Sequence, residues 1–409
     1  MATAEIAAYS EAARSGRYEK PAGLLGKYDN VRRFWEDMQI GLYLQPYLER
    51  LVLAKKERGE KLRVMDIGCG SGDGFELLMA IDRGGTTAAE HNTKLIEPDI
   101  LGFYKGIDIN DVLLEQARGI YGSNGNIAFV CSDLNEFDFQ GEEPYDLYFA
   151  NYGTLSHNSD EQTVNLLGTI GQYGRNGTLI LVDWLGRYSY EWQTLWTHDL
   201  KHNQWMDYAI SYIRAPEEGQ KELTYFPLRF VGRREVQSIY RGANERAGGS
   251  LALRALGDRS SFVGRHVDTA QYNRHCQPWR GRVNSLFEMG IRTNLEELFV
   301  RYVPREGFPR VNAYHQGLAE CWNHLVAYTM ALLSDERPPD PPNGMPSALR
   351  RGRRAMRAAV RAARNVKTGD PRASLVEPQL AYCLRGLEMV LQQGLGCGHG
   401  LVAIFEVVK

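Results

Sequence analysis

Apolar residues in the first half of the chain follow two alternating patterns. Short, nearly continuous apolar runs occupy 64–67, 103–109, 127–131, 145–151 and 177–184. Between them, apolar residues recur at helical spacing over 75–81, 111–120 and 159–172. Doubly buried parallel strands read as continuous apolar runs, and strands that alternate with helices form parallel sheets with right-handed crossovers. The pattern therefore predicts an α/β fold with these five runs as strands.

The rest of the chain predicts additions to this sheet. Helical spacing over 28–56 follows a loosely held lead-in over 1–27. A sixth strand is predicted near 249–256 and a seventh at 401–408, with helices at 285–302, 311–333 and 378–393. We predict four parts: an N-terminal helical cap (1–60), a core (61–258) with an aromatic-rich insertion (185–230), a mostly helical cap (259–396) and a last strand (397–409).

A glycine-rich turn follows the first strand. The segment Asp66-Ile67-Gly68-Cys69-Gly70-Ser71-Gly72 separates the run 64–67 from the helical stretch 75–81. Such a strand–turn–helix unit brings backbone N–H groups and a helix N-terminus up to a ligand. The dinucleotide pattern G-x-G-x-x-G fails, because Asp73 and Phe75 occupy the third glycine positions, and no Gly-Lys-Ser/Thr follows as a Walker A loop requires.

This acid-x-Gly-x-Gly-x-Gly segment resembles the first motif of class I S-adenosylmethionine (SAM) dependent methyltransferases, with Asp66 as the family's acid. The resemblance implies a seven-stranded, mostly parallel, doubly wound sheet with SAM as cofactor. It also implies that Asp108, at the end of the second strand, accepts the ribose hydroxyls. Ser132-Asp133-Leu134, after the third strand, would then meet the adenine. An inserted loop over 82–100 accounts for the long separation between Asp108 and the glycine turn.

These residues all follow strands whose C-terminal ends share one edge of the sheet, where open α/β sheets bind ligands. Asn151 and Tyr152, after the fourth strand, belong to the same edge, and Tyr28 is a candidate contact from the covering helix. The predicted cofactor site comprises Asp66, Gly68, Cys69, Gly70, Gly72, Asp108, Ile109, Ser132, Asp133, Leu134, Asn151, Tyr152 and Tyr28.

Acceptor-side residues should come from the ends of strands four and five and from the segment that covers them. His157 is the first candidate base, with a loop histidine bonded to backbone as the alternative. Asp183 is the second, and it could equally cap the following turn. Tyr188 and Tyr190 begin the aromatic segment, which is either a lid over the acceptor or the core of a helical cap.

Two further clusters carry polar chemistry. His198 and His202 share one face if their segment is helical, but no third metal ligand is evident, so we predict a substrate-facing or solvated pair and no metal. Arg265 and His266 stand beside Asp268 and could bind an anionic group of the acceptor, or form a surface salt-bridge network.

Composition narrows the class of protein. The 409 residues are 43% hydrophobic and 24% charged, with a net charge of −2, so no global field attracts nucleic acid or anionic membrane. No apolar run approaches the length of a membrane span, and Met1 to Gly16 lacks the pattern of a secretory signal. The six cysteines are scattered, as in a reduced compartment, so we predict a cytoplasmic protein.

We predict a methyltransferase that acts on an O or N atom of a small molecule. One rival is a nucleic-acid methyltransferase that uses the basic segment 350–367, although strand four ends in Asn-Tyr-Gly-Thr rather than a Pro-Pro-Tyr motif. Another is a non-catalytic subunit with the same fold, and a third is a nicotinamide-dependent dehydrogenase. The helical surfaces at 28–56 and 311–333 are candidates for a homodimer contact.

Overall fold

The computed structural model describes residues 2–19, 26–84, 93–199, 205–213 and 223–409. Nine strands form its sheet in this part of the chain. They are β1 (Leu62–Ile67), β2 (Leu101–Asp108), β3 (Ile127–Cys131), β4 (Leu147–Ala150), β5 (Leu179–Gly186), β6 (Trp205–Tyr208), β7 (Phe226–Val231), β8 (Leu251–Arg259) and β9 (Gly400–Val407).

Seven of these strands form the sheet that the sequence predicts. The first five lie in the order β3-β2-β1-β4-β5, and every neighbouring pair is parallel. The last strand, β9, pairs antiparallel with β5 along its other side, and β8 pairs antiparallel with β9. The resulting order, β3-β2-β1-β4-β5-β9-β8 with β9 reversed, confirms a mostly parallel, doubly wound sheet of the class I methyltransferase type.

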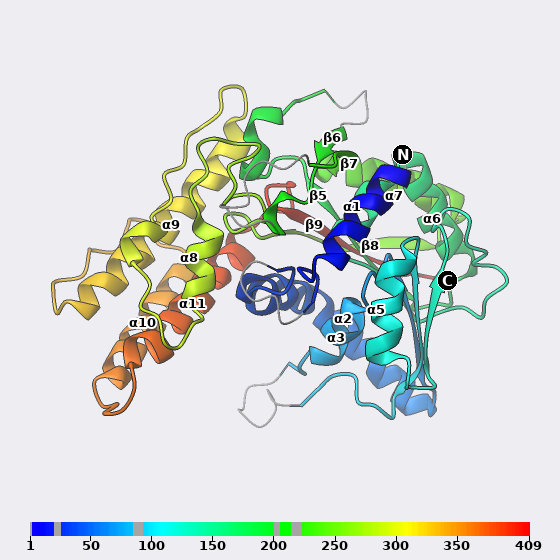
Figure 1. Ribbon diagram of the computed structural model, residues 1–409, viewed down its shortest axis with the longest axis horizontal. Helices are drawn as coiled ribbons and strands as arrows, with labels where there is room; N and C mark the ends of the chain where they lie inside the picture. The colour runs from blue at the N-terminus through cyan, green and yellow to red at the C-terminus, as the bar shows by residue number, and fades with distance from the viewer. Residues whose placement is uncertain (1, 20–25, 85–92, 200–204, 214–222) are drawn as a thin grey trace.

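Helices cover both faces of the sheet and build a separate lobe (Figure 1). The α-helices are α1 (Ala2–Arg14), α2 (Asp37–Arg58), α3 (Asp73–Ala80), α5 (Asp111–Tyr121), α6 (Asp160–Tyr173), α7 (Arg233–Arg246), α8 (Trp279–Ser285), α9 (Pro309–Leu333), α10 (Ser347–Ala363) and α11 (Glu377–Leu391). Short 3-10 turns are η3 (Thr154–His157), η4 (Tyr190–Leu195), η5 (Ser211–Ile213) and η7 (Leu295–Leu298), and π-helical turns are η2 (Arg32–Glu36) and η8 (Arg372–Val376).

Three buried clusters divide the interior. One lies between the sheet and α2, α3 and α5, and a second lies between the opposite face and α6 and α7. The third runs from α1 through η4, β6 and β7 into α8–α11. In Figure 1 the helices α8–α11 form a lobe at the left, at the end of the molecule opposite α6 and the C-terminus.

Local sequence fixes the ends of the elements that matter for the site. Asn110 caps α5, because its side chain accepts a hydrogen bond from the Leu113 amide at 3.3 Å. Ser159 and Gln162 form a capping box at the start of α6. Gly59 ends α2 in the left-handed conformation that glycine adopts without steric cost.

Several sequence predictions are wrong. The segment predicted as a loosely held lead-in contains the helix α1, which packs on α5 through Ala8, Ala12 and Ala13. A single helix over 285–302 is absent, because α8 ends at Ser285 and a non-helical stretch precedes η7. The aromatic insertion adds the strands β6 and β7, which pair with each other and extend the sheet beside the end of β5.

Candidate functional site

The glycine turn lies where β1 gives way to α3. Gly68, Gly70 and Gly72 have φ angles of 66°, 53° and 86°, in the left-handed region that L side chains rarely adopt. A Cβ atom on Gly68 would lie 2.5 Å from Thr154 Cγ2, so glycine is also required by the close approach of η3. Cys69, between them, is buried, and burial raises the pKa of its thiol well above the usual range. The sequence therefore folds here into an open backbone cradle.

Asp108 joins the end of β2 to this turn. Its Oδ2 accepts a hydrogen bond from the Gly70 amide and its Oδ1 one from the Asn110 amide, both at 2.8 Å. Burial raises the pKa of this carboxyl group, and the two backbone hydrogen bonds oppose that shift. The structure thus brings together two residues that lie far apart in the sequence and that were both predicted in the cofactor site.

The segment after β3 continues the same edge. The Ser132 amide donates to the Asp108 carbonyl at 2.9 Å, and Ile109 lies beside it, since its own carbonyl accepts from the Cys131 thiol. The Asp133 carboxylate accepts from the Asn135 amide at 2.8 Å, and Leu134 is half-buried against the sheet core. The predicted ribose and adenine residues therefore follow adjacent strands, as the parallel pairing of β2 and β3 requires.

Beneath and beside the turn, two buried polar atoms lack a hydrogen-bond partner among the described residues. They are Asp66 Oδ1 and Asn151 Nδ2. Asp66 receives one hydrogen bond, from Tyr104, on its other oxygen, and burial raises the pKa of Asp66 to about 7. Buried polar groups are seldom left unsatisfied, so a ligand or a water molecule at this edge would complete the hydrogen bonding of these two atoms.

Tyr152 leaves β4 in an unusual conformation. Its φ of 55° is left-handed, which is rare for a residue with a bulky side chain. The Arg32 guanidinium lies 3.1 Å from the centroid of its ring, and its hydroxyl donates to Asp37. Tyr152 is thereby tied to η2 and to the start of α2, the segment that covers the edge of the sheet.

Residues that the sequence did not suggest also cover the glycine turn. Lys27 forms an ion pair with Asp73 at the start of α3, and its ammonium lies 5.6 Å from the ring centroid of Tyr28. The side chain of Asn110 donates to the Ile6 carbonyl at 3.2 Å, which docks α1 beside Asp108. Nothing in the spacing of Lys27 signalled this contact, because an isolated lysine in a polar segment reads as an exposed residue.

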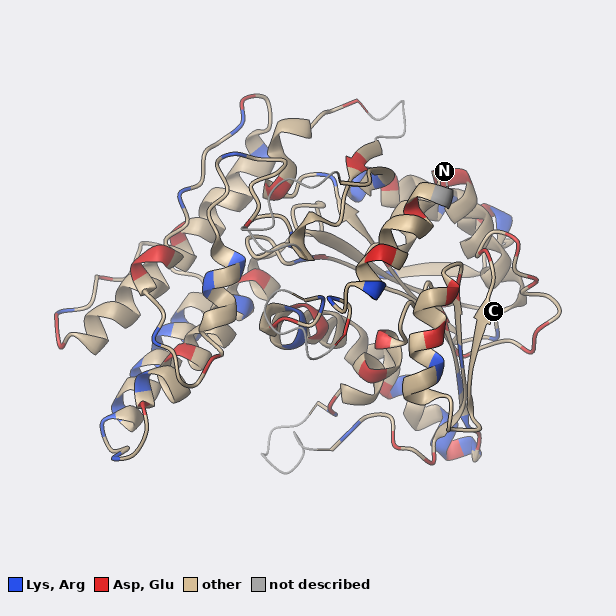
Figure 2. Cartoon of the chain, viewed as in Figure 1, with Lys and Arg blue, Asp and Glu red and all other residues tan. Residues whose placement is uncertain are grey.

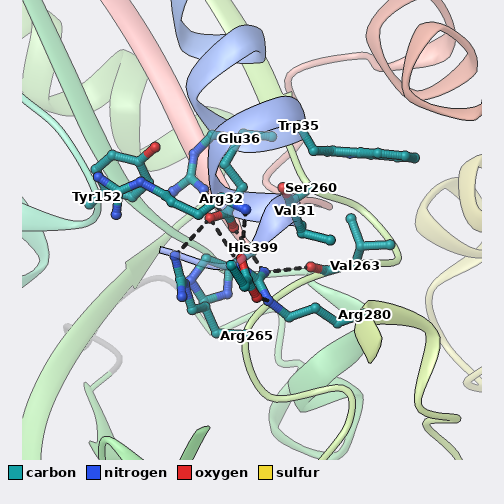
Figure 3. A network of polar contacts seen from close by, with 12 residues as sticks. Val31, Arg32, Trp35, Glu36, Tyr152, Ser260, Val263, Arg265, Arg280 and His399 are labelled. Atoms are coloured by element: carbon teal, nitrogen blue, oxygen red, sulfur yellow. Dashed lines mark hydrogen bonds and ion pairs between the residues drawn. The ribbon is translucent and has the colours of Figure 1, made fainter. Parts of the chain in front are cut away.

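A buried network of charges holds the covering segments to the sheet (Figure 3). The Glu36 carboxylate pairs with Arg259 at 3.2 Å, Arg265 at 3.1 Å and Arg280 at 3.3 Å. Burial alone would raise the pKa of Glu36, but the three arginines hold it well below its usual range. Arg280 also pairs with Asp29 at 2.7 Å, so two acids and three arginines from distant segments meet in one place.

This network engages two of the residues predicted to act on the acceptor. Asp183 pairs with Arg259 at 2.6 Å, and Arg265 pairs with Glu36. His157, the other candidate base, lies 2.9 Å from Glu5 of α1 and stacks on Phe226 with ring centroids 6.1 Å apart. Their catalytic and binding roles stay predictions. Asp183 and Arg265 each have an ionic partner, and His157 lies beside a carboxylate.

The aromatic and histidine candidates divide between core and surface. Tyr190 is fully buried beside Trp279, whereas Tyr188 is half-buried against Trp196. His266 is buried, its amide donates to Glu191 at 2.6 Å, and burial lowers the pKa of its ring to about 3, so the imidazole is neutral. These contacts pack His266 and Tyr190 into the cap.

The conditional prediction of a helical histidine pair is not realised at His198. The segment after η4 is not helical there, and His198 instead stacks on Phe308 and contacts the Gly307 carbonyl at 2.7 Å. His202 lies outside the described residues. Among the residues that the structure describes, no group of three or more His, Cys, Asp or Glu side chains could hold a metal ion.

Comparisons with known proteins give a consistent but distant picture. No protein-family model and no curated protein matches the chain. Solved structures that match include a SAM-dependent methyltransferase from Clostridium acetobutylicum ATCC 824, at 12% identity and a TM-score of 0.32, which covers 52% of this chain and 83% of its own. SAM-bound CalS10, an amino pentose methyltransferase from Micromonospora echinaspora, matches at 12% identity and a TM-score of 0.33, covering 56% and 88%.

A third match is the CcbJ methyltransferase from Streptomyces caelestis, at 15% identity and a TM-score of 0.33, covering 52% and 81%. At these identities and TM-scores the matches carry no argument about substrate or partner. The strand order and the polar edge described above define the fold, which is that of the class I SAM-dependent methyltransferases. None of the helices in the described part of the chain combines the length and apolarity that a membrane crossing requires.

The raised pKa of Asp66 predicts how stability depends on pH in the ligand-free protein. The folded-state pKa of about 7 exceeds the value near 3.9 of an unfolded chain. Between these values the folded state retains a proton that the unfolded state has lost, so the free energy of unfolding falls as pH rises. Asp66→Asn should flatten that decline in urea titrations from pH 4 to 8. Parallel declines in the two proteins would contradict the assignment.

The charge network predicts a large stability effect at Glu36. Glu36→Gln removes the buried negative charge that three arginines share, and it should lower the free energy of unfolding by about 3–5 kcal/mol. Glu297→Gln is the matched control, because its pair with Arg282 is exposed, and it should cost about 0–1 kcal/mol. Denaturant unfolding monitored by circular dichroism measures both, and equal effects would show that the Glu36 network contributes little.

Proposed function

We propose that the protein is a SAM-dependent methyltransferase that acts on an oxygen or nitrogen atom of a small-molecule acceptor. The observation that carries the proposal is the hydrogen bond between Asp108 and the Gly70 amide, which joins the glycine turn to the acid after β2. A ligand that spans both strand ends is what the resemblance implies for SAM. The unsatisfied buried atoms Asp66 Oδ1 and Asn151 Nδ2 lie along that same edge and fit a polar cofactor.

In this proposal each group along the edge holds one part of the cofactor. The turn 68–72 and the N-terminus of α3 border its methionine part, and Asp108 accepts the ribose hydroxyls. Ser132, Asp133 and Leu134 border the adenine. When bound, SAM supplies an electrophilic methyl group on a sulfonium. The protein contributes alignment of the acceptor, exclusion of water and a group that takes the acceptor's proton.

The placement of the basic segment supports a small acceptor over a nucleic acid. Figure 2 shows Lys and Arg gathered along α10, in the helical lobe at the opposite end from α5. Part of that charge is already used within the lobe, since Arg364 pairs with Asp335 and Arg353 lies 4.5 Å from the ring centroid of Tyr328. The basic face is thus separate from the glycine turn. A cytoplasmic location and a homodimer remain part of the proposal.

The cofactor assignment is tested at Gly70. Its φ of 53° is rarely adopted by L side chains, so Gly70→Val should distort the cradle and abolish binding of S-adenosylhomocysteine in calorimetric titrations. Gly177→Val is the matched control, because Gly177 has a φ of 86° but precedes β5 at the opposite edge of the sheet. The control should bind like the wild type. Unchanged affinity in Gly70→Val would reject the glycine turn as the cofactor site.

A further inference from the structure

A groove runs between α2 and α3, next to the glycine turn. Its volume is about 420 Å³, within the range of small-molecule sites. Its walls combine apolar side chains with the charged side chains of Arg33, Asp37, Asp73, Glu76, Asp82 and Arg83. The walls also include Tyr28, Met38, Gly41, Leu42, Leu77 and Ala80.

Glycine keeps this groove open. A Cβ atom on Gly41 would meet only Ile81, at 3.5 Å, so the absence of a side chain leaves space between the two helices. Met38 and Leu42 beside it are 40% and 47% exposed, a high value for large apolar side chains on a helix that packs against the core. A second hollow of about 490 Å³ is lined by Gly177 and Thr178 before β5, at the edge of the sheet away from the glycine turn.

The end of the groove that borders the cofactor edge is polar, and Asp37 is its most distinctive residue. Asp37 Oδ1 accepts from Arg32 Nε at 2.8 Å and from the Tyr152 hydroxyl. Asp37 Oδ2 receives no hydrogen bond from any described residue, although a carboxylate oxygen can accept two. One oxygen is therefore committed to the protein, and the side chain as a whole is 25% exposed and lines the groove.

Asp37 also connects the groove to the proposed cofactor site. Through Tyr152 it is linked to the residue that follows β4, and Asp73, at the start of α3, lines the groove as well. The backbone of Tyr152 is strained in the left-handed region, and in this conformation its side chain contacts Arg32 and Asp37. Strain of this kind at the end of a central strand is typical of functional sites.

We propose that the α2–α3 groove binds the methyl acceptor, a compact and mainly apolar molecule whose hydroxyl or amine group donates a hydrogen bond to Asp37 Oδ2. This inference rests on the proposed methyl transfer and assigns its substrate class. A two-ring aromatic alcohol or amine has this combination of an apolar body and one donor.

The electrostatics of Asp37 agree with a binding role. Burial raises the pKa of its carboxyl group, while the Arg32 guanidinium and the hydrogen bond from Tyr152 oppose that shift. Charges that face it from neighbouring elements are Arg32 and Glu36 of η2, and Asp73 lies across the groove on α3. The net shift of the Asp37 pKa is upward, and hydrogen bonds to an ionised carboxylate are stronger than neutral ones, so a donor on the acceptor gains most affinity at pH values above that pKa.

The probe is 2-naphthol, compared with 2-methoxynaphthalene, which has the same ring system but no donor. Fluorescence titrations should show saturable binding of 2-naphthol to the wild type, about tenfold or more tighter than 2-methoxynaphthalene. Asp37→Ala should remove this preference while 2-methoxynaphthalene binds as before.

Two variants test the groove itself. Gly41→Leu fills the space between the helices and should weaken binding of both probes by about tenfold or more. Gly119→Leu, at an exposed helical glycine of α5 with no neighbour within 4 Å, is the matched control and should bind like the wild type. Leu42→Glu changes an exposed lining residue without burying new volume, and it should weaken binding of both probes if Gly41→Leu fails to fold.

Calorimetry with S-adenosylhomocysteine separates the two proposals. If Asp37→Ala, Gly41→Leu and Leu42→Glu bind S-adenosylhomocysteine as tightly as the wild type does, the variants fold and the cofactor site is distinct from the groove. Absence of 2-naphthol binding, or equal binding by wild type, Gly41→Leu and Leu42→Glu, overturns the acceptor site but leaves the cofactor assignment intact. Absence of S-adenosylhomocysteine binding by the wild type overturns the proposed function, and with it the role of the groove as an acceptor site.

Discussion

The ion pairs around Glu36 are the interaction on which the rest of the site depends. Removing a carboxylate and three guanidinium groups from water is costly, and only close pairing and further hydrogen bonds compensate for that cost. Here the partners come from η2, from the end of β8, from the loop that follows it and from α8. The network therefore holds the N-terminal cap, the sheet and the helical lobe in a single arrangement over the C-terminal edge of the sheet.

The C-terminal edge of the sheet brings together residues that lie far apart in the sequence. Parallel pairing places the ends of β1, β2, β3 and β4 side by side, so the turn 68–72, Asp108, Asp133 and Asn151 gather without any of them being close in sequence. The N-terminal segments that cover this edge add Lys27, Arg32 and Asp37. Lys27 contacts the start of α3, and Arg32 and Asp37 contact Tyr152 at the end of β4. The residues of the proposed cofactor site and of the proposed acceptor groove thus come largely from different layers of the fold.

The sheet and its polar edge could be predicted because each rests on a local pattern. Continuous apolar runs mark doubly buried strands, and an acid such as Asp108 directly after a run must lie at the strand end. The helix α1 was missed because it packs through small residues, Ala8, Ala12 and Ala13, which give weak periodicity. The helix predicted over 285–302 is absent because α8 ends at Ser285, and Asn294 caps the separate turn η7.

The network around Glu36 could not be predicted, for a different reason. Its members extend from Asp29 to Arg280, and no spacing in the sequence signals that isolated acids and arginines so far apart will be buried together. The same holds for Asp37, which accepts a hydrogen bond from Tyr152, a residue far away in the sequence. Only the structure shows which charged residues, distant in the sequence, lie close together in the fold.

Hydrogen–deuterium exchange with and without S-adenosylhomocysteine tests the central claim most directly, because it locates the ligand without any substitution. The account predicts slower exchange at residues 68–73, 108–110 and 132–135, with no change in α10. Slowed exchange confined to the helical lobe, or no change along the sheet edge at saturating ligand, would contradict the assignment of this edge as the cofactor site.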